Sequence, residues 1–90
     1  MDVRWDPAKA KANLRKHGVR FSDAESVFFD PLSLTMEDSS SEGEQRFVSI
    51  GVDSGGRVVV VVYTHRDEEI RLISARLANR HEIRTYEEGL

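Results

Sequence analysis

The sequence contains no cysteine, which excludes disulfide bonds and metal sites built on thiolates. Histidine is also scarce, and His17, His65 and His81 do not have the H-x-x-x-H spacing of a zinc site. No stretch approaches the roughly 20 apolar residues that a membrane-spanning helix needs, and the N-terminus lacks the apolar run of a signal peptide. We therefore expect a cytoplasmic protein that uses no metal or other cofactor and has no membrane partner.

Motifs that hold nucleotides or position a serine nucleophile are also missing. Neither G-x-x-x-x-G-K-[ST] nor G-x-G-x-x-G occurs, so a glycine-rich phosphate loop is not indicated. The G-x-S-x-G pattern of hydrolases with a serine nucleophile is absent too. What remains as a source of chemistry is a set of basic side chains.

Charge is distributed very unevenly along this short chain. Its 90 residues are 39% hydrophobic, which fits one small folded domain over residues 1–90. Residues 1–22 hold six basic and two acidic side chains, residues 23–45 hold seven acidic and no basic ones, and residues 46–90 hold seven of each. Because the acids are concentrated in the middle segment, the net charge of −3 does not exclude an anionic partner.

The first third of the chain predicts a short strand and two helices. Residues 3–5 are suited to the strand, and Asp6-Pro7 then supplies an N-cap and a first helical residue. That helix should cover residues 7–17 and end at Gly18, a residue suited to the left-handed conformation. The second helix should begin at Ser22, which forms an S-x-x-E capping box with Glu25, and should end before Pro31.

The rest of the chain predicts a sheet followed by one more helix. Alternating or β-branched segments at residues 32–36, 46–52, 57–64 and 70–76 read as strands, separated by an acidic loop at 37–45 and a glycine turn at 53–56. Asn79 and Glu82 form a second capping box for a helix over 80–88 that ends at Gly89. The fold class is therefore α+β: a small antiparallel β-sheet meander with two N-terminal helices and one C-terminal helix, all packed on one face.

Arginines late in the chain form the candidate site. Arg66 follows the long central strand and is adjacent to Arg71 in the meander, while Arg80 and Arg84 share one face of the last helix. Regular alternation would place Arg71 and residues 73 and 75 on one side of the sheet. We expect the arginines to gather at one end of the sheet, near the basic face of the first helix, where guanidinium groups could bind phosphate bidentately.

Each of these residues also has a structural interpretation. Arg80 and Arg84 could form weak ion pairs with Glu87 and Glu88 on a solvated helix face, and Arg71 could pair with Glu69. The lysines could be the ordinary outer face of a small helix. His17 could pack against a local carbonyl, and Tyr86 could be a core residue with a polar tip. Patterns alone therefore support a small α+β domain with a candidate anion site.

Four stretches of the chain resemble, in the same order, the BrnT toxins of bacterial type II toxin–antitoxin modules. They are WDPAKAKANLRKHGVRFSDAESVFFDP, RFVSIG, VVVVVYTHR and IRLISARLANRHEIRTYEEG, and their most specific parts are K-H-G-V and R-L-I-S-A-R. The resemblance implies a RelE-like fold and a metal-independent endoribonuclease that cleaves RNA and inhibits translation and growth. It also implies a BrnA-like antitoxin with a ribbon-helix-helix part, so that DNA is contacted only through the antitoxin.

The resemblance also suggests roles for individual residues. The expected catalytic set comprises a guanidinium clamp with candidate proton acceptors: Arg66, Arg71, Arg76, His17 and Glu82. The expected RNA contacts are Lys9, Lys16, Arg80, Arg84, His65 and Tyr86, of which His65 departs from the family pattern and is a further candidate acceptor. Tyr86 or a lysine is a candidate proton donor.

Alternatives of another class stay open at this point. The chain could be a non-catalytic interaction module, or an inactive toxin that acts mainly as partner and co-repressor of a DNA-binding antitoxin. Exposed phenylalanines among Phe28, Phe29 and Phe47 could form the strip that the antitoxin covers. Assembly as a homodimer or as a hetero-oligomer with the antitoxin is compatible with either class.

Overall fold

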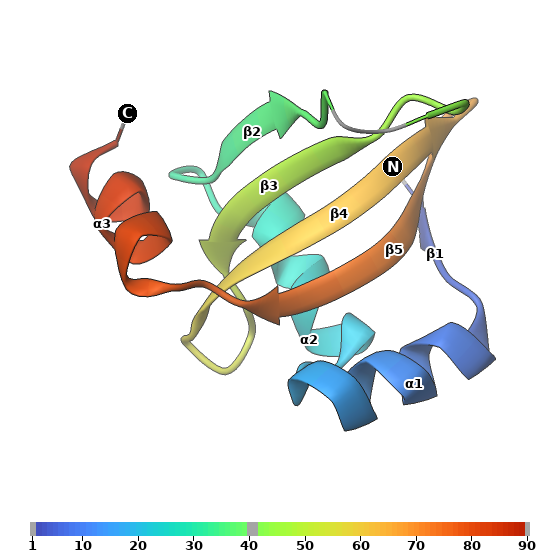
Figure 1. Cartoon of the computed structure of the whole chain (residues 1–90), viewed down its shortest axis with the longest axis horizontal. Coiled ribbons are helices and arrows are strands. Elements are labelled where there is room, and N and C mark those ends of the chain that lie inside the picture. The colour runs from blue at the N-terminus through green and yellow to red at the C-terminus, as the bar shows by residue number, and fades with distance from the viewer. Residues whose placement is uncertain (1, 40–41, 90) are drawn as a thin grey trace.

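The computed structural model describes residues 2–39 and 42–89, so residues 40 and 41 of the predicted acidic loop lie outside the described part. The elements follow one another as β1 (Asp2–Arg4), α1 (Pro7–His17), α2 (Phe21–Ala24), the 3₁₀-helix η1 (Glu25–Phe29), β2 (Leu34–Glu37), β3 (Phe47–Val52), β4 (Val58–Arg66), β5 (Glu69–Leu77) and α3 (Arg80–Glu88) (Figure 1). This order confirms the predicted α+β class, with helices at both ends of the chain.

The five strands form one sheet in the order β1-β5-β4-β3-β2. The pairs β2–β3, β3–β4 and β4–β5 are antiparallel, as the meander predicts. Strand β1 pairs with β5 in parallel, from Asp2 opposite Glu69 to Arg4 opposite Arg71. The sheet is therefore mostly antiparallel, and the wholly antiparallel sheet of the prediction is corrected at this edge.

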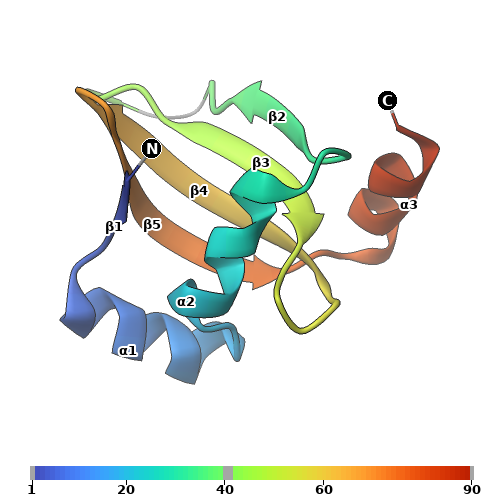
Figure 2. The same ribbon diagram turned by 180° about the vertical axis from the view of Figure 1, so that it is seen from behind.

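One face of the sheet carries the hydrophobic core. Its buried residues come from β4, β5, α2 and the segments beside α2: Val19, Phe21, Ala24, Val27, Val59, Val61, Tyr63, Ile70, Leu72 and Ala75. Helices α1 and α2 cover this face (Figure 2). Helix α3 lies apart from them, beside the end of β3, so the expectation that all three helices share one face is wrong (Figures 1 and 2).

A β-bulge interrupts the pairing of the two longest strands. Val62 lies opposite Ser74 and Tyr63 lies opposite Leu72, which leaves Ile73 without a partner on β4. Because one extra residue shifts the alternation of sides, Leu72 and Ala75 both enter the core. Arg71 and Arg76 then lie together on the opposite face, where regular alternation would have separated them. The predicted grouping of Arg71 with Ala75 is therefore wrong.

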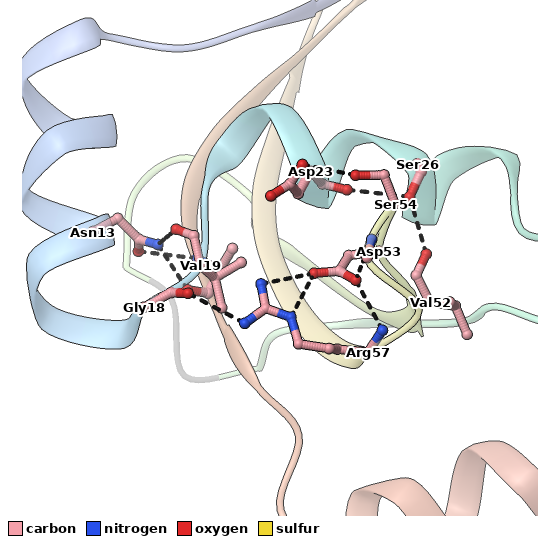
Figure 3. Close-up of polar contacts among 11 residues, drawn as sticks. Asn13, Gly18, Val19, Asp23, Ser26, Val52, Asp53, Ser54 and Arg57 are labelled. Atoms are coloured by element: carbon pink, nitrogen blue, oxygen red, sulfur yellow. Dashed lines mark hydrogen bonds and ion pairs between the residues drawn. The ribbon is translucent and has the colours of Figure 1, made fainter.

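Helix α1 begins and ends as its sequence predicts, and a buried asparagine fixes it to the sheet. The Asp6 carboxylate accepts a hydrogen bond of 2.8 Å from the Ala8 N–H, and Gly18 adopts a positive φ of 70°. Asn13 donates to the carbonyls of Val19 and Ala75 at 3.0 and 2.8 Å, and accepts at 3.1 Å from the Ala75 N–H. The bonds to Ala75 hold α1 against the edge of β5 that faces away from β4, beyond the segment that pairs with β1, and Figure 3 shows Asn13 beside Val19.

The second helix departs from the prediction at its start and in its type. It begins at Phe21 with Arg20 as N-cap and no side-chain capping bond, so the capping box of Ser22 and Glu25 does not form. After Ala24 the chain continues as the tighter η1 up to Phe29. The buried Phe21 and Ala24 pack in the core, which shows that packing rather than local capping fixes this start.

The turn between β3 and β4 is locked by a buried carboxylate. Asp53 accepts from Nε and Nη2 of Arg57 at 3.1 and 3.0 Å, and from the backbone N–H groups of Gly55 and Arg57. Nη1 of Arg57 donates to the Gly18 carbonyl at 3.3 Å, which joins the turn to the end of α1 (Figure 3). Arg57 therefore has a structural role at this turn.

Candidate anion-binding site

Two of the predicted arginines lie together near the turn that joins β4 and β5. Arg71 is opposite Thr64, and Arg66 is two residues further along β4, on the same side as Thr64. This side faces away from α1 and α2. A pocket of ≈ 210 Å³ opens here, and it is lined by four cationic side chains, Lys9, Arg46, Arg66 and Arg71, and by three acidic ones, Asp6, Glu42 and Glu44.

A carboxylate of the acidic segment already sits in this pocket. Nε and Nη2 of Arg66 donate to Oε2 and Oε1 of Glu44, both at 3.1 Å. This two-point geometry is the one by which a guanidinium group binds a carboxylate or a phosphate. Both side chains are about half exposed, 56% for Arg66 and 45% for Glu44, so water and ions reach the pair.

Several arginines act electrostatically on the Glu44 carboxylate. The hydrogen bond from Arg66 lowers the pKa of the Glu44 carboxyl, desolvation opposes it, and the charges of Arg66, Arg71 and Arg46 lower it further. The same hydrogen bond raises the pKa of the Arg66 guanidinium. Within residues 2–39 and 42–89, the side chains of Lys9, Arg46 and Arg71 form no hydrogen bond or ion pair. Among the described residues, the pocket thus combines one paired cation with three whose side chains have no hydrogen-bond or ion-pair partner.

A second hollow of ≈ 230 Å³ adjoins the first between α1 and β5. It contains two of the predicted RNA contacts and one predicted catalytic residue, Lys9, Lys16 and His17, together with Ile73 and Ser74 of the bulge. Lys9 and Ile73 line both hollows. The structure therefore brings five predicted residues, Lys9, Lys16, His17, Arg66 and Arg71, to one continuous surface.

Arg76 and Glu82 lie elsewhere and bind each other. Nη1 and Nη2 of Arg76 donate to Oε1 and Oε2 of Glu82, both at 2.8 Å, which raises the pKa of Arg76 and lowers that of Glu82. Arg76 pairs with Val60, six residues before Arg66 on β4, a distance of about 20 Å along a strand. The expectation that all the arginines gather at one end of the sheet is therefore wrong.

Arg80, Arg84 and Tyr86 belong to α3 and line neither hollow. Arg80 and Arg84 are exposed, whereas the Tyr86 hydroxyl donates to Oδ2 of Asp30 at 2.6 Å. This bond raises the pKa of Tyr86 to about 12. Burial alone would raise the pKa of Asp30, but hydrogen bonds from Tyr86, Leu32 and Val52 together lower it. Tyr86 thus attaches α3 to the body of the protein and is poorly suited to donate a proton to RNA.

His65 lies at the same end of the sheet as Arg66 but on the other side. Its ring packs edge-on against Phe47 and Tyr63, with centroids 5.1 and 5.7 Å apart, and Tyr63 belongs to the core face. Of the proposed proton acceptors, His17 alone lines the connected hollows.

Sequence reasoning missed Arg46 and the carboxylates of the acidic segment. Arg46 precedes β3, which runs antiparallel to β4, so its start lies beside the end of β4 that carries Arg66. That pairing was available from the predicted meander. The position of Glu44 could not be predicted, because a loop without turn motifs does not fix where its residues lie relative to the strands.

In the described part of the chain, no group of three or more histidine, aspartate or glutamate side chains has a metal-binding arrangement. Among the same residues, no helix is long and apolar enough to cross a membrane.

The chain is thus a small α+β protein with a pocket at one end of its sheet that is lined by four cationic and three acidic side chains. The family described as BrnT, the ribonuclease toxin of type II toxin–antitoxin systems, matches residues 5–82. The chain therefore belongs to the BrnT family and is a toxin with ribonuclease activity, whose type II module implies an antitoxin partner.

A solved structure supports the same conclusion. The crystal structure of the Brucella abortus ribonuclease toxin BrnT is similar to this chain, with a TM-score of 0.69 and 25% sequence identity over 89% of this chain and 99% of that one. No protein with a curated description matches the chain in sequence.

Proposed function

We propose that this toxin is a metal-independent endoribonuclease and that its pocket near the β4–β5 turn binds the phosphate at which RNA is cut. The observation that carries this proposal is the Glu44 carboxylate, bound at two points by Arg66 within the field of Arg46 and Arg71. A phosphodiester carries the same single charge and presents two oxygens in a similar arrangement. Glu44 thus occupies the place of the RNA phosphate.

The reaction needs no group beyond those of the chain and the RNA. The 2′-hydroxyl attacks the adjacent phosphorus, the bond to the 5′-oxygen breaks, and the products carry a 2′,3′-cyclic phosphate and a 5′-hydroxyl. Negative charge grows on the phosphoryl oxygens in the transition state, and preorganised guanidinium groups of Arg46, Arg66 and Arg71 stabilise it. His17 is the proposed acceptor of the 2′-hydroxyl proton, and Lys9, which lines the phosphate pocket, is the proposed donor of a proton to the leaving 5′-oxygen.

Cleavage of a circular RNA in EDTA tests this function. A circle has no ends, so only an endonuclease opens it, and EDTA removes divalent metals. We expect the purified toxin to produce a linear molecule with a cyclic phosphate at its 3′ end. An intact circle under these conditions would instead support the non-catalytic interaction module.

We further propose that the partner is a BrnA-like ribbon-helix-helix antitoxin, through which alone the toxin contacts DNA. Phe28 and Phe47 pack against the core, so they do not form the apolar strip expected from the sequence. Phe29, Leu32 and Met36 are 69%, 66% and 49% exposed on and shortly before β2, which is one of the two edge strands of the sheet. In Phe29→Ser, the amount of antitoxin that co-purifies with the toxin should fall while RNA cleavage persists. Light scattering of the complex should then show whether it is a homo- or hetero-oligomer.

A further inference from the structure

The second hollow begins where strand β1 stops protecting the edge of β5. The parallel pairing ends with Arg4 opposite Arg71, and beyond it α1 lies along the edge of β5, fixed by the hydrogen bonds of Asn13 to Ala75. Ile73, the bulged residue, falls in this interval and lines both hollows. The bulge therefore marks the passage between the phosphate pocket and the hollow beside α1.

The side chains of this hollow suit a nucleoside with a further phosphate. Ala12 and Ile73 provide apolar surface for a base, and Ser74 provides a hydroxyl group. Lys9 and Lys16 lie about 10 Å apart on α1, two helical turns from each other, and neither side chain is paired within the described residues. The spacing places one ammonium group at the phosphate pocket and the other at the far end of the hollow.

We infer that this hollow binds the nucleoside on the 5′ side of the cleaved phosphate, and that Lys16 binds the next phosphate in the 5′ direction. The inference rests on the proposed function, because it takes the arginine pocket as the place of the cleaved phosphate. The direction follows from the proposed proton acceptor: the attacking 2′-hydroxyl belongs to the nucleoside on the 5′ side, and His17 is one of the residues that line this hollow. A nucleoside placed here brings its 2′-hydroxyl toward a proton acceptor.

Binding of small nucleotides tests the inference without cleavage. A nucleoside 3′-monophosphate should place its phosphate in the arginine pocket and its nucleoside in the hollow. A nucleoside 3′,5′-bisphosphate adds the phosphate that Lys16 should bind. We expect the bisphosphate to bind about five- to tenfold more tightly at low salt, because a hydrogen bond to a charged group is added. Titration calorimetry with each of the four bases measures this gain.

Two lysine variants then test which side chain causes this gain in affinity for the bisphosphate. Lys16→Ala should abolish it and leave binding of the 3′-monophosphate nearly unchanged. Lys11→Ala removes the same charge from a side of α1 that lines neither hollow, so it should keep the gain. Thermal unfolding of each variant establishes that α1 is folded. No gain in the parent protein, or a gain that survives Lys16→Ala, overturns the inference.

Arg71→Ala separates this inference from the proposed function. If Arg71→Ala weakens both nucleotides equally while Lys16→Ala leaves the gain intact, the phosphate pocket stands and only the second subsite is wrong. If Arg71→Ala affects neither nucleotide, the phosphate pocket itself is wrong.

Discussion

The pairing of Arg66 with Glu44 shows how a single residue can reveal a site while contributing little to the fold. Ion pairs between exposed side chains stabilise proteins weakly because water and salt screen them and two long side chains lose freedom. This pair therefore opens easily, and its two-point geometry leaves Arg66 oriented for another anion. If the pocket binds RNA as proposed, a weak internal ligand of this kind should compete with RNA without excluding it.

Replacement of Glu44 by glutamine should strengthen RNA binding. Without the carboxylate Arg66 is released, so KM for RNA should fall about two- to fivefold while kcat stays near the parental value. Glu42→Gln is the matched control, because Glu42 lines the same pocket but forms no ion pair with a described residue. An effect of Glu44→Gln no larger than that of Glu42→Gln would show that Glu44 does not occupy the phosphate position.

At the scale of elements, α3 is held to the domain by polar contacts. None of its residues is fully buried. The side-chain bonds that attach it to other elements include the Arg76–Glu82 pair and the Tyr86–Asp30 bond, and a capping box of Asn79 with Glu82 stabilises its first turn. The Arg76–Glu82 pair should thus serve the placement of α3, and its contribution should depend on pH.

Replacement of Glu82 by glutamine should be more destabilising at neutral than at acidic pH. The hydrogen bond from Arg76 lowers the Glu82 pKa below its ordinary value of 4.5. The stabilisation is therefore present above pH 4.5 and is lost as the pH falls through the lowered pKa. Glutamine still permits a capping box, so Glu82→Gln isolates the ion pair. Denaturant unfolding between pH 7 and 3 should show a shrinking difference from the parent, and a constant difference would contradict this account.

Replacement of Asn13 by alanine should detach α1 from the sheet. Asn13 is 7% exposed, and its loss leaves the Ala75 N–H and two backbone carbonyls without partners in a buried region. We expect the free energy of unfolding to fall by about 3 kcal/mol, because each unsatisfied buried group costs about 1–3 kcal/mol. Urea titrations of Asn13→Ala and of the exposed control variant Lys11→Ala measure this fall in the free energy of unfolding. A loss below about 1 kcal/mol would show that α1 is held by other contacts.

At the scale of the whole molecule, the helix caps could be predicted from the sequence because they depend on neighbouring residues. The register between strands could not be predicted in this way. The caps at Asp6, Gly18, Asn79 and Gly89 were predicted and are present, because each depends on residues within a few positions. The capping box at Ser22 was predicted and fails, because burial of Phe21 starts α2 earlier. The strand segments were recognised, but the bulge at Ile73 was not, although the apolar–polar alternation of "IRLISAR" breaks at the consecutive apolar residues Leu72 and Ile73.

The candidate site was predictable to the same extent. Arg66 and Arg71 meet because a tight turn joins their strands, which the meander already required. Arg76 does not join them, since a nine-residue strand carries it to the other end of the sheet. The basic face of α1 lies near the pocket as expected, with Lys9 reaching it directly. Individual catalytic roles stay predictions.

The rate of RNA cleavage in EDTA by Arg71→Ala, measured beside Arg76→Ala, tests the central claim most directly. Both arginines lie on the same side of β5, but Arg71 lines the pocket and Arg76 binds Glu82. If the pocket near the β4–β5 turn stabilises the transition state, Arg71→Ala should lower the rate about 10²- to 10³-fold. Arg76→Ala should mainly reduce stability and retain a rate within about tenfold of the parent. A folded Arg71→Ala protein that cleaves RNA at the parental rate would contradict the claim.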